Sequence, residues 1–109
     1  QDYTAAMEWF KKAAAQGTAN AQHNIGLLFN IGGGVAQDYA TAMEWFQKAA
    51  AQGLAAAQYD IGLLFYNGHG VAQDYAAAMD WYKKAAAQGH AAAQHNVACL
   101  FNSGRGVAK

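Results

Sequence analysis

The sequence predicts an all-α solenoid of stacked helix pairs, and three observations lead to that fold class. The string Gln-Asp-Tyr at residues 1–3 returns at residues 37–39 and 73–75, which gives a repeat period of 36 residues. Each copy contains two segments with helical spacing, and glycine follows both segments. A unit of this size cannot bury its apolar face alone, so neighbouring copies must share a core. We therefore expect one solenoid domain over residues 1–109, with copies at 1–36, 37–72 and 73–108.

The first segment of each copy has the pattern of an amphipathic helix, which we expect from Asp2 to Gln16 in the first copy. We call it the first-type helix. Aspartate at positions 2, 38 and 74 can cap the first backbone amides, and glycine at positions 17, 53 and 89 supplies the left-handed residue that ends such a helix. The apolar face expected to turn toward the core consists of Tyr3, Ala6, Met7, Phe10, Ala13 and Ala14.

Two further features of the first-type helix recur in every copy. An acidic residue stands four positions before a lysine, an orientation that stabilises helices by roughly 0.2–0.5 kcal/mol per pair. We therefore expect solvated ion pairs between Glu8 and Lys12, between Glu44 and Lys48, and between Asp80 and Lys84. A tryptophan identical in all copies flanks the apolar face, which favours packing over binding as the role of Trp9, Trp45 and Trp81.

The second segment predicts a second-type helix at Ala19–Ile31, Ala55–Asn67 and Ala91–Ser103, each followed by a Gly-X-Gly turn. The turn lacks the strand, lysine and hydroxyl residue of a phosphate-binding loop, so we interpret it as structural. Gly26 and Gly62 should allow close helix approach, and Ala98 replaces them in the third copy. The constant residues expected to pack against the first-type helices are Ala21, Gln22, Ile25, Leu28 and Phe29 in the first copy.

One block of residues recurs along essentially the whole chain and carries a family resemblance. In the second copy it consists of Ala42, Trp45, Phe46, Lys48, Ala49, Ala50, Gly53, Ala55, Ala57, Gln58, Ile61, Gly62, Leu64, Phe65, Gly68, Gly70 and Val71. This block resembles the Sel1-like repeat, a relative of the tetratricopeptide repeat. The resemblance implies a right-handed α/α superhelix of antiparallel helix pairs. It also implies a concave face that serves as an adaptor or scaffold for other proteins.

The cysteine content separates this chain from one branch of that family. Some secreted bacterial members are cysteine-rich, with a disulfide tying each helix pair, and are described as binding or slowly cleaving β-lactams. Cys99 is the single cysteine here, so this alternative is disfavoured. His95 and Cys99, four residues apart, could provide half of a zinc site or a nucleophile with a base. No further ligand or orienting group is identifiable, and we expect no metal, no cofactor and no catalytic residue.

The charge and hydropathy of the chain argue against some classes of binding partner. Seven basic and seven acidic residues give no net charge, which argues against a nucleic-acid footprint or a polybasic membrane patch. No apolar run approaches the roughly 20 residues that span a bilayer. The chain shows no signal-peptide pattern and opens at Gln1 in mid-repeat, which suggests a fragment of a longer protein. The compartment stays open between the bacterial cytoplasm and periplasm.

Comparison of the three copies separates constant columns from columns that change chemistry. On the second-type helices the changing columns fall within an arc of about 120°, at 100° per residue, and the resemblance places this arc on the concave side. Aromatic anchors provide contact area and amides bond an extended backbone, so the arc suits recognition of a partner protein or peptide. The predicted partner-binding residues are Asn20, His23, Asn24, Leu27, Asn30, Ile31, Tyr59, Asp60, Leu63, Tyr66, Asn67, His95, Asn96, Cys99, Asn102 and Ser103.

Other interpretations stay open at this point. The changing columns could be tolerant surface positions, which would make the chain a purely architectural spacer. His69 and Arg105, in the variable position of the Gly-X-Gly turn, could extend the binding edge or be ordinary exposed loop residues. The chain begins with a first-type and ends with a second-type helix, and neither has the polar outer face of a capping repeat. We therefore also expect head-to-tail self-association through these unpaired terminal helices, as a ring or an open filament.

Overall fold

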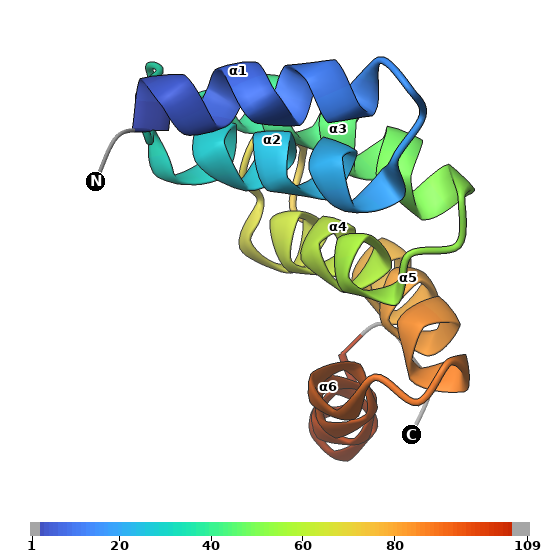
Figure 1. The fold of residues 1–109 in the computed structure, drawn as a ribbon. Helices are drawn as coiled ribbons and strands as arrows, with labels where there is room; N and C mark the ends of the chain where they lie inside the picture. The colour runs from blue at the N-terminus through green and yellow to red at the C-terminus, as the bar shows by residue number, and fades with distance from the viewer. Residues whose placement is uncertain (1–2, 106–109) are drawn as a thin grey trace.

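The computed structural model describes residues 3–105, and this part of the chain forms an elongated, all-helical solenoid with extents of 47 × 26 × 21 Å (Figure 1). All three second-type helices have the expected bounds, whereas the first-type helices end before the expected position, at Ala14 rather than Gln16 in the first copy. None of the described helices is long and apolar enough to cross a membrane. The helices are α1 (Tyr3–Ala14), α2 (Ala19–Ile31), α3 (Tyr39–Ala51), α4 (Ala55–Asn67), α5 (Tyr75–Ala87) and α6 (Ala91–Ser103).

Aspartate side chains begin the first-type helices, as expected. The Asp38 carboxylate accepts hydrogen bonds from the Thr41 hydroxyl at 2.8 Å and from the Thr41 backbone amide at 3.1 Å. These bonds hold the pKa of Asp38 below its ordinary value because they stabilise the ionised carboxylate. Asp74 accepts a hydrogen bond from the Ala77 amide in the same way, and the third predicted cap, Asp2, lies outside the described residues. At the far end of α3, Gly53 takes the left-handed φ of 86° that was expected there.

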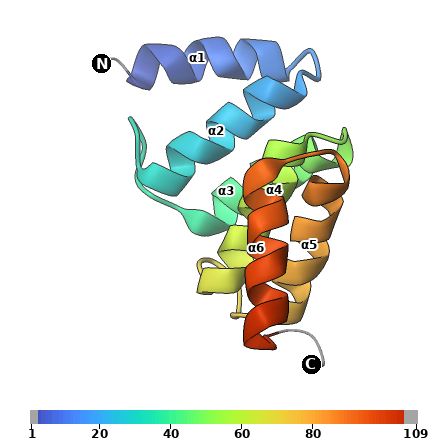
Figure 2. The same ribbon diagram turned by 90° about the horizontal axis from the view of Figure 1, so that it is seen from below.

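The helices stack in two layers that follow a right-handed superhelix. The first-type helices α1, α3 and α5 form one layer, and the second-type helices α2, α4 and α6 form the other (Figures 1 and 2). The chain curves so that α2, α4 and α6 lie on the inside of the curve (Figure 1). We call the side of these three helices that faces away from the first-type helices the inner surface. The changing columns were expected on this side.

The closest helix packing occurs where a second-type helix meets the next first-type helix, α2 with α3 and α4 with α5. Gly62 is buried against the ring of Tyr82, and a Cβ atom on this glycine would stand 2.6 Å from that ring. Gly26 has the same relationship with Phe46. The equivalent Ala98 is exposed, since no helix follows α6 in the described chain to cover it. The predicted role of the two glycines is therefore confirmed.

The constant residues of the second-type helices also pack as expected. Ala21, Ile25 and Leu28 are buried against the first-type helices. The constant glutamines bond from one copy to the next: Gln52 Nε2 donates to Gln22 Oε1 at 2.9 Å, and the same bond recurs between the equivalent glutamines one copy later, at 3.0 Å. Apolar burial and this amide pairing therefore share one helix face, which explains why these columns stay constant or change only from isoleucine to valine, at Val97.

The packing of each tryptophan depends on an apolar cluster that two neighbouring copies share. Trp45 packs against a cluster around Ile25 in the preceding copy, and Trp81 packs against the cluster around Ile61. Trp9 is 69% exposed, because no helix of the described residues packs against this side of α1. The packing prediction is therefore correct for Trp45 and Trp81 and wrong for Trp9.

The lysines of the first-type helices lie over tryptophan rings rather than beside carboxylates. The Lys12, Lys48 and Lys84 ammonium groups lie 4.7, 4.3 and 4.1 Å from the ring centroids of Trp9, Trp45 and Trp81. Among the described residues the one ion pair within 4.0 Å is His23 with Asp60, so the expected pairs of Glu8, Glu44 and Asp80 with these lysines are wrong. A lysine over an exposed ring gains about 0.5–1 kcal/mol, at least as much as a solvated helix pair.

Candidate binding surface along α2, α4 and α6

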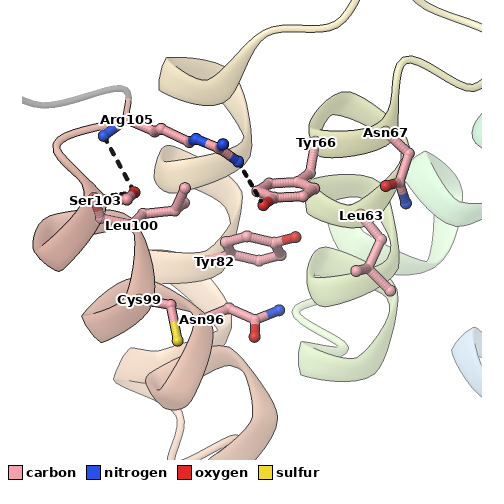
Figure 3. Close-up of a pocket in the computed structure, with 9 residues that line it drawn as sticks. All are labelled: Leu63, Tyr66, Asn67, Tyr82, Asn96, Cys99, Leu100, Ser103 and Arg105. Atoms are coloured by element: carbon pink, nitrogen blue, oxygen red, sulfur yellow. Dashed lines mark hydrogen bonds between the residues drawn. The ribbon is translucent and has the colours of Figure 1, made fainter.

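The inner surface contains two cavities, and each lies between successive second-type helices. The first cavity, of about 220 Å³, lies between α2 and α4 and is lined by Asn30, Tyr39, Phe46, Asp60, Leu63, Leu64, Asn67 and His69. The second cavity, of about 530 Å³, lies between α4 and α6 and is lined by Leu63, Tyr66, Asn67, Tyr82, Asn96, Cys99, Leu100, Ser103 and Arg105 (Figure 3).

The two cavities are the same feature in successive copies. Adding one repeat period to seven of the eight residues around the first cavity gives a residue around the second. Leu63 and Asn67 line both cavities, because α4 is the wall that they share. A surface that repeats in step with the fold offers a long ligand a series of equivalent positions. The matching residues are Asn30 with Tyr66, Phe46 with Tyr82, Asp60 with Asn96, Leu63 with Cys99, Leu64 with Leu100, Asn67 with Ser103, and His69 with Arg105.

Side-chain contacts near the start of the second-type helices hold neighbouring walls together. His23 Nε2 on α2 lies 2.6 Å from Asp60 Oδ2 on α4, and both side chains are largely buried. One copy later, Asn96 Nδ2 on α6 donates to the Tyr59 hydroxyl on α4 at 3.4 Å. The same two columns therefore make an imidazole–carboxylate contact in one copy and an amide–hydroxyl hydrogen bond in the next. The Asp60 carboxylate is paired with an imidazole, whereas the corresponding group of the second cavity is an uncharged amide.

An aromatic ring from a first-type helix forms the inner wall of each cavity. Phe46 and Tyr82 are both 1% exposed. Burial raises the pKa of Tyr82 to about 12, partly opposed by a hydrogen bond from Asn96. The phenol therefore stays neutral at physiological pH and can serve as a hydrogen-bond donor. This gives the second cavity a polar atom that Phe46 cannot supply to the first.

The variable residue of the Gly-X-Gly turn reaches over a tyrosine of the preceding first-type helix. The His69 ring stacks on Tyr39 with a centroid separation of 4.4 Å. The Arg105 guanidinium lies 5.1 Å from the centroid of the Tyr75 ring, and its Nη1 donates to the Tyr66 hydroxyl at 3.1 Å (Figure 3). These turn residues therefore lie at the edges of the two cavities, and their side chains are positioned by aromatic contacts.

The structure brings half of the predicted residues to the cavities. Tyr59 instead packs its ring against Tyr82 and His90. Leu27 packs against the apolar cluster around Ile61, which we call the central apolar cluster. Ile31 is 60% exposed and lies outside both cavities. Those that line a cavity are Asn30, Asp60, Leu63, Tyr66, Asn67, Asn96, Cys99 and Ser103. Those that do not are Asn20, His23, Asn24, Leu27, Ile31, Tyr59, His95 and Asn102.

Several cavity residues were absent from the predicted set. Phe46 and Tyr82 belong to a first-type column that had been assigned to the core, although its change from phenylalanine to tyrosine was a readable signal. Leu64 and Leu100 are constant in sequence, so the comparison of copies could not select them. His69 and Arg105 had been considered as a possible extension of the binding edge, because they occupy a variable column of the Gly-X-Gly turn.

The one cysteine lies next to the histidine four residues before it. Cys99 Sγ is 3.4 Å from His95 Nε2, and both residues are exposed on α6. Within residues 3–105 no three His, Cys, Asp or Glu side chains gather closely enough to hold a metal ion. Cys99 contributes its side chain to the wall of the second cavity.

Comparison with known proteins accounts for this repeated architecture. The family model of the Sel1 repeat matches residues 1–18, 19–54, 55–90 and 91–109. The chain belongs to the Sel1 repeat family. Sel1 repeat proteins generally act as scaffolds for protein–protein interaction and are generally non-catalytic. The complete Sel1 repeats at 19–54 and 55–90 join α2 to α3 and α4 to α5, the two pairs with the closest packing.

Two solved bacterial structures share the fold. The crystal structure of c5321, a protective antigen of uropathogenic Escherichia coli strains displaying an SLR fold, is 44% identical with a TM-score of 0.90. It matches 93% of this chain and 22% of its own. A Sel1 repeat protein from Oxalobacter formigenes is 40% identical with a TM-score of 0.85, over 88% of this chain and 40% of its own. The Sel1 repeats described here therefore span less than half of either solved protein. A search of curated proteins finds no match.

Proposed function

We propose that this chain is a protein-interaction module that binds an extended segment of a partner protein along its inner surface. The observation that carries the proposal is the recurrence of one cavity at consecutive copies, with α4 as the shared wall. Extended solenoid surfaces commonly bind partners in this way, because a ligand can contact several equivalent units at once. Catalysis is not part of the proposal, since the family is generally non-catalytic.

The chemistry of the inner surface supports a peptide as the ligand. Leucine and aromatic side chains provide apolar contact area in both cavities, while asparagines at their edges can bond backbone amides and carbonyls. On the outer side of the molecule, a hollow of about 630 Å³ is lined by α3 alone, from Glu44 to Ala51. That hollow is lined by a single helix of one copy, so by itself it offers an extended chain no series of equivalent positions.

The proposal can be tested with a substitution that obstructs both cavities at once. Asn67 is exposed and lines both of them, so the bulky indole of Asn67→Trp should block the inner surface at little cost in stability. Gln47→Trp is the matched control, because Gln47 is also an exposed amide but lies in the outer hollow on α3. Circular dichroism should show both variants folded, with melting temperatures within a few degrees of the parent protein.

Peptides selected by display on the folded parent protein supply the ligands. We expect Asn67→Trp to weaken their binding at least tenfold in fluorescence anisotropy and Gln47→Trp to leave it unchanged. Failure to select any peptide would contradict the proposal and favour the architectural spacer. Peptides that bind Asn67→Trp normally but lose affinity for Gln47→Trp would also contradict it, because they would place recognition on the outer side.

A further inference from the structure

The two cavities differ in charge, and this difference affects which peptides the surface would bind. At the start of the first cavity the Asp60 carboxylate is paired with His23. Asn96, which replaces Asp60 in the second cavity, carries no charge. At the other end His69 is replaced by Arg105, which is always protonated near neutral pH. From one copy to the next, the cavity therefore loses an acidic group and gains a permanent cation.

Two contacts position the Arg105 guanidinium, and neither of them is with a carboxylate. The Tyr75 ring lies beneath its guanidinium at 5.1 Å, and the Tyr66 hydroxyl accepts one hydrogen bond from Nη1 (Figure 3). Within residues 3–105 no Asp or Glu oxygen lies within 4.0 Å of this group. Arginine has five N–H donors, and the bond to Tyr66 uses one of them. A planar cation held in this way is suited to a ligand carboxylate, which it can bind through two parallel hydrogen bonds.

The rest of the second cavity fits the side chain that would bring such a carboxylate. Leu63 and Leu100 form apolar walls, against which the methylene groups of a glutamate can pack. The Asn96 amide donates to the Tyr59 hydroxyl, and together with the neutral Tyr82 phenol it keeps this part of the cavity wall uncharged. Figure 3 shows Arg105 and Tyr66 near one end of the cavity and Asn96 near the other. The first cavity is lined by leucines and the Phe46 ring, its Asp60 carboxylate is paired with His23, and it has no arginine. It therefore suits an apolar side chain better than a carboxylate.

We infer that the inner surface recognises an extended peptide that places an apolar side chain in the first cavity and a glutamate against Arg105 in the second. This inference rests on the proposed function. Side-chain contacts join α4 to α2 and to α6, and helices in such contact lie about 8–10 Å apart. An extended chain in the polyproline II conformation advances about 3.1 Å per residue and returns its side chains to the same face every three residues. The two side chains are therefore expected about three residues apart in the ligand. The first cavity has no arginine among its lining residues, so the glutamate preference belongs to the second cavity alone.

The probes for this inference are fluorescein-labelled ten-residue peptides in which a phenylalanine and a glutamate are separated by two serines, in both orders. Matched peptides carry glutamine or lysine in place of the glutamate. We expect at least one order of the glutamate peptide to bind the parent protein at least tenfold more tightly than its glutamine counterpart. The difference should disappear in Arg105→Gln and give way to a preference for lysine in Arg105→Glu. His69→Gln, the equivalent change at the first cavity, should retain the preference for glutamate.

The outcomes separate this inference from the function on which it rests. If display-selected peptides depend on Asn67 but the glutamate and glutamine probes bind the parent protein equally, the carboxylate site is wrong and the proposed function stands. If neither probe binds while selected peptides do, the inference is likewise overturned. A glutamate preference that survives Arg105→Gln would also contradict it, because the carboxylate would then be bound elsewhere.

Discussion

His23 and Asp60 join α2 to α4 through a contact of 2.6 Å between Nε2 and Oδ2, and Tyr59 and Asn96 join α4 to α6 from the same two columns. The repeat thus preserves a link between neighbouring walls of the inner surface while its chemistry changes. The partners in both pairs are 37 residues apart, one more than the repeat period of 36. Each pair therefore joins a residue of one copy to the neighbouring column of the next copy. The link, rather than the identity of either residue, is what the fold requires.

A substitution swap tests that equivalence. Asp60→Ala should lower the free energy of unfolding by about 1 kcal/mol, because it leaves the largely buried His23 without its partner. The double variant with His23→Tyr and Asp60→Asn recreates the pair found one copy later, and should stay within about 0.5 kcal/mol of the parent protein. Urea denaturation measures both changes. A double variant no more stable than Asp60→Ala would contradict the equivalence of the two pairs.

The glycine contact between α4 and α5 predicts a cost for one added methyl group. Gly62→Ala places a Cβ 2.6 Å from the buried Tyr82 ring. Overpacking costs about 1–3 kcal/mol, and so short a contact with a buried ring belongs in the upper part of that range, about 2–3 kcal/mol. The opposing gain in helix propensity is about 1 kcal/mol. We expect a net loss of about 1–2 kcal/mol in chemical denaturation. Ala98→Leu, at the exposed equivalent position, is the control and should change stability by less than about 0.5 kcal/mol. Equal stability of the parent protein and Gly62→Ala would show that the ring yields without cost.

The tryptophans should differ sharply in energetic importance despite their identity in sequence. Trp81→Ala removes a ring that packs against the central apolar cluster, and should cost about 2–3 kcal/mol, below the range for a fully buried tryptophan. Trp9→Ala removes a ring that is 69% exposed and should cost less than about 0.5 kcal/mol. Guanidinium denaturation followed by circular dichroism compares the two variants. Similar losses for both would mean that Trp9 is covered in solution.

The raised pKa of Tyr82 predicts that the protein loses stability in alkaline solution. This pKa is raised to about 12 in the folded protein, from an ordinary value of 10.0. The folded state therefore retains the phenolic proton more strongly, and this contribution is complete below about pH 10 and is lost as the pH rises through 12. Denaturation midpoints measured over this range should fall less steeply in Tyr82→Phe than in the parent protein. Parallel pH profiles would contradict the assignment.

Head-to-tail association remains a prediction, and the structure identifies residues with which to test it. Trp9 on α1 is 69% exposed and Phe101 on α6 is 47% exposed. If α6 of one molecule packs on α1 of the next, the average mass from light scattering should rise with protein concentration. Trp9→Glu should reduce that rise, while Gln47→Glu, on the exposed side of α3, should not. A constant monomer mass over a wide concentration range would eliminate this association.

Much of the fold could be predicted because local patterns and the repeat agree. The bounds of Ala55–Asn67 follow from helical spacing that ends at Gly68, and the role of Gly62 follows from its place beside a constant apolar face. Ion pairing was predicted wrongly because helical spacing permits two neighbours for Lys48. Glu44 stands four residues before it and Trp45 three, and the structure places the ammonium over the ring. Such a choice depends on side-chain geometry that spacing alone does not contain.

The candidate binding surface was predictable only in part, for a related reason. Variation between copies selected Asn67 and Tyr66, but it could not select Leu100, because that residue serves the core and a cavity wall at the same time. Nor could it show that Tyr59 turns its ring toward Tyr82 and His90 instead of a cavity. A column comparison reports which positions tolerate change. It does not report which side chains meet across two helices.

The sequence by itself determined the period, the two helix types and the close approach at Gly26 and Gly62. These properties depend on residues near one another in the chain or on columns that recur. Only the tertiary structure decided that Leu63 and Asn67 line two equivalent cavities, that Arg105 reaches across to Tyr66, and that Trp9 is exposed. Those properties depend on how far one copy turns and shifts against the next, because the stacking of neighbours sets which distant side chains meet.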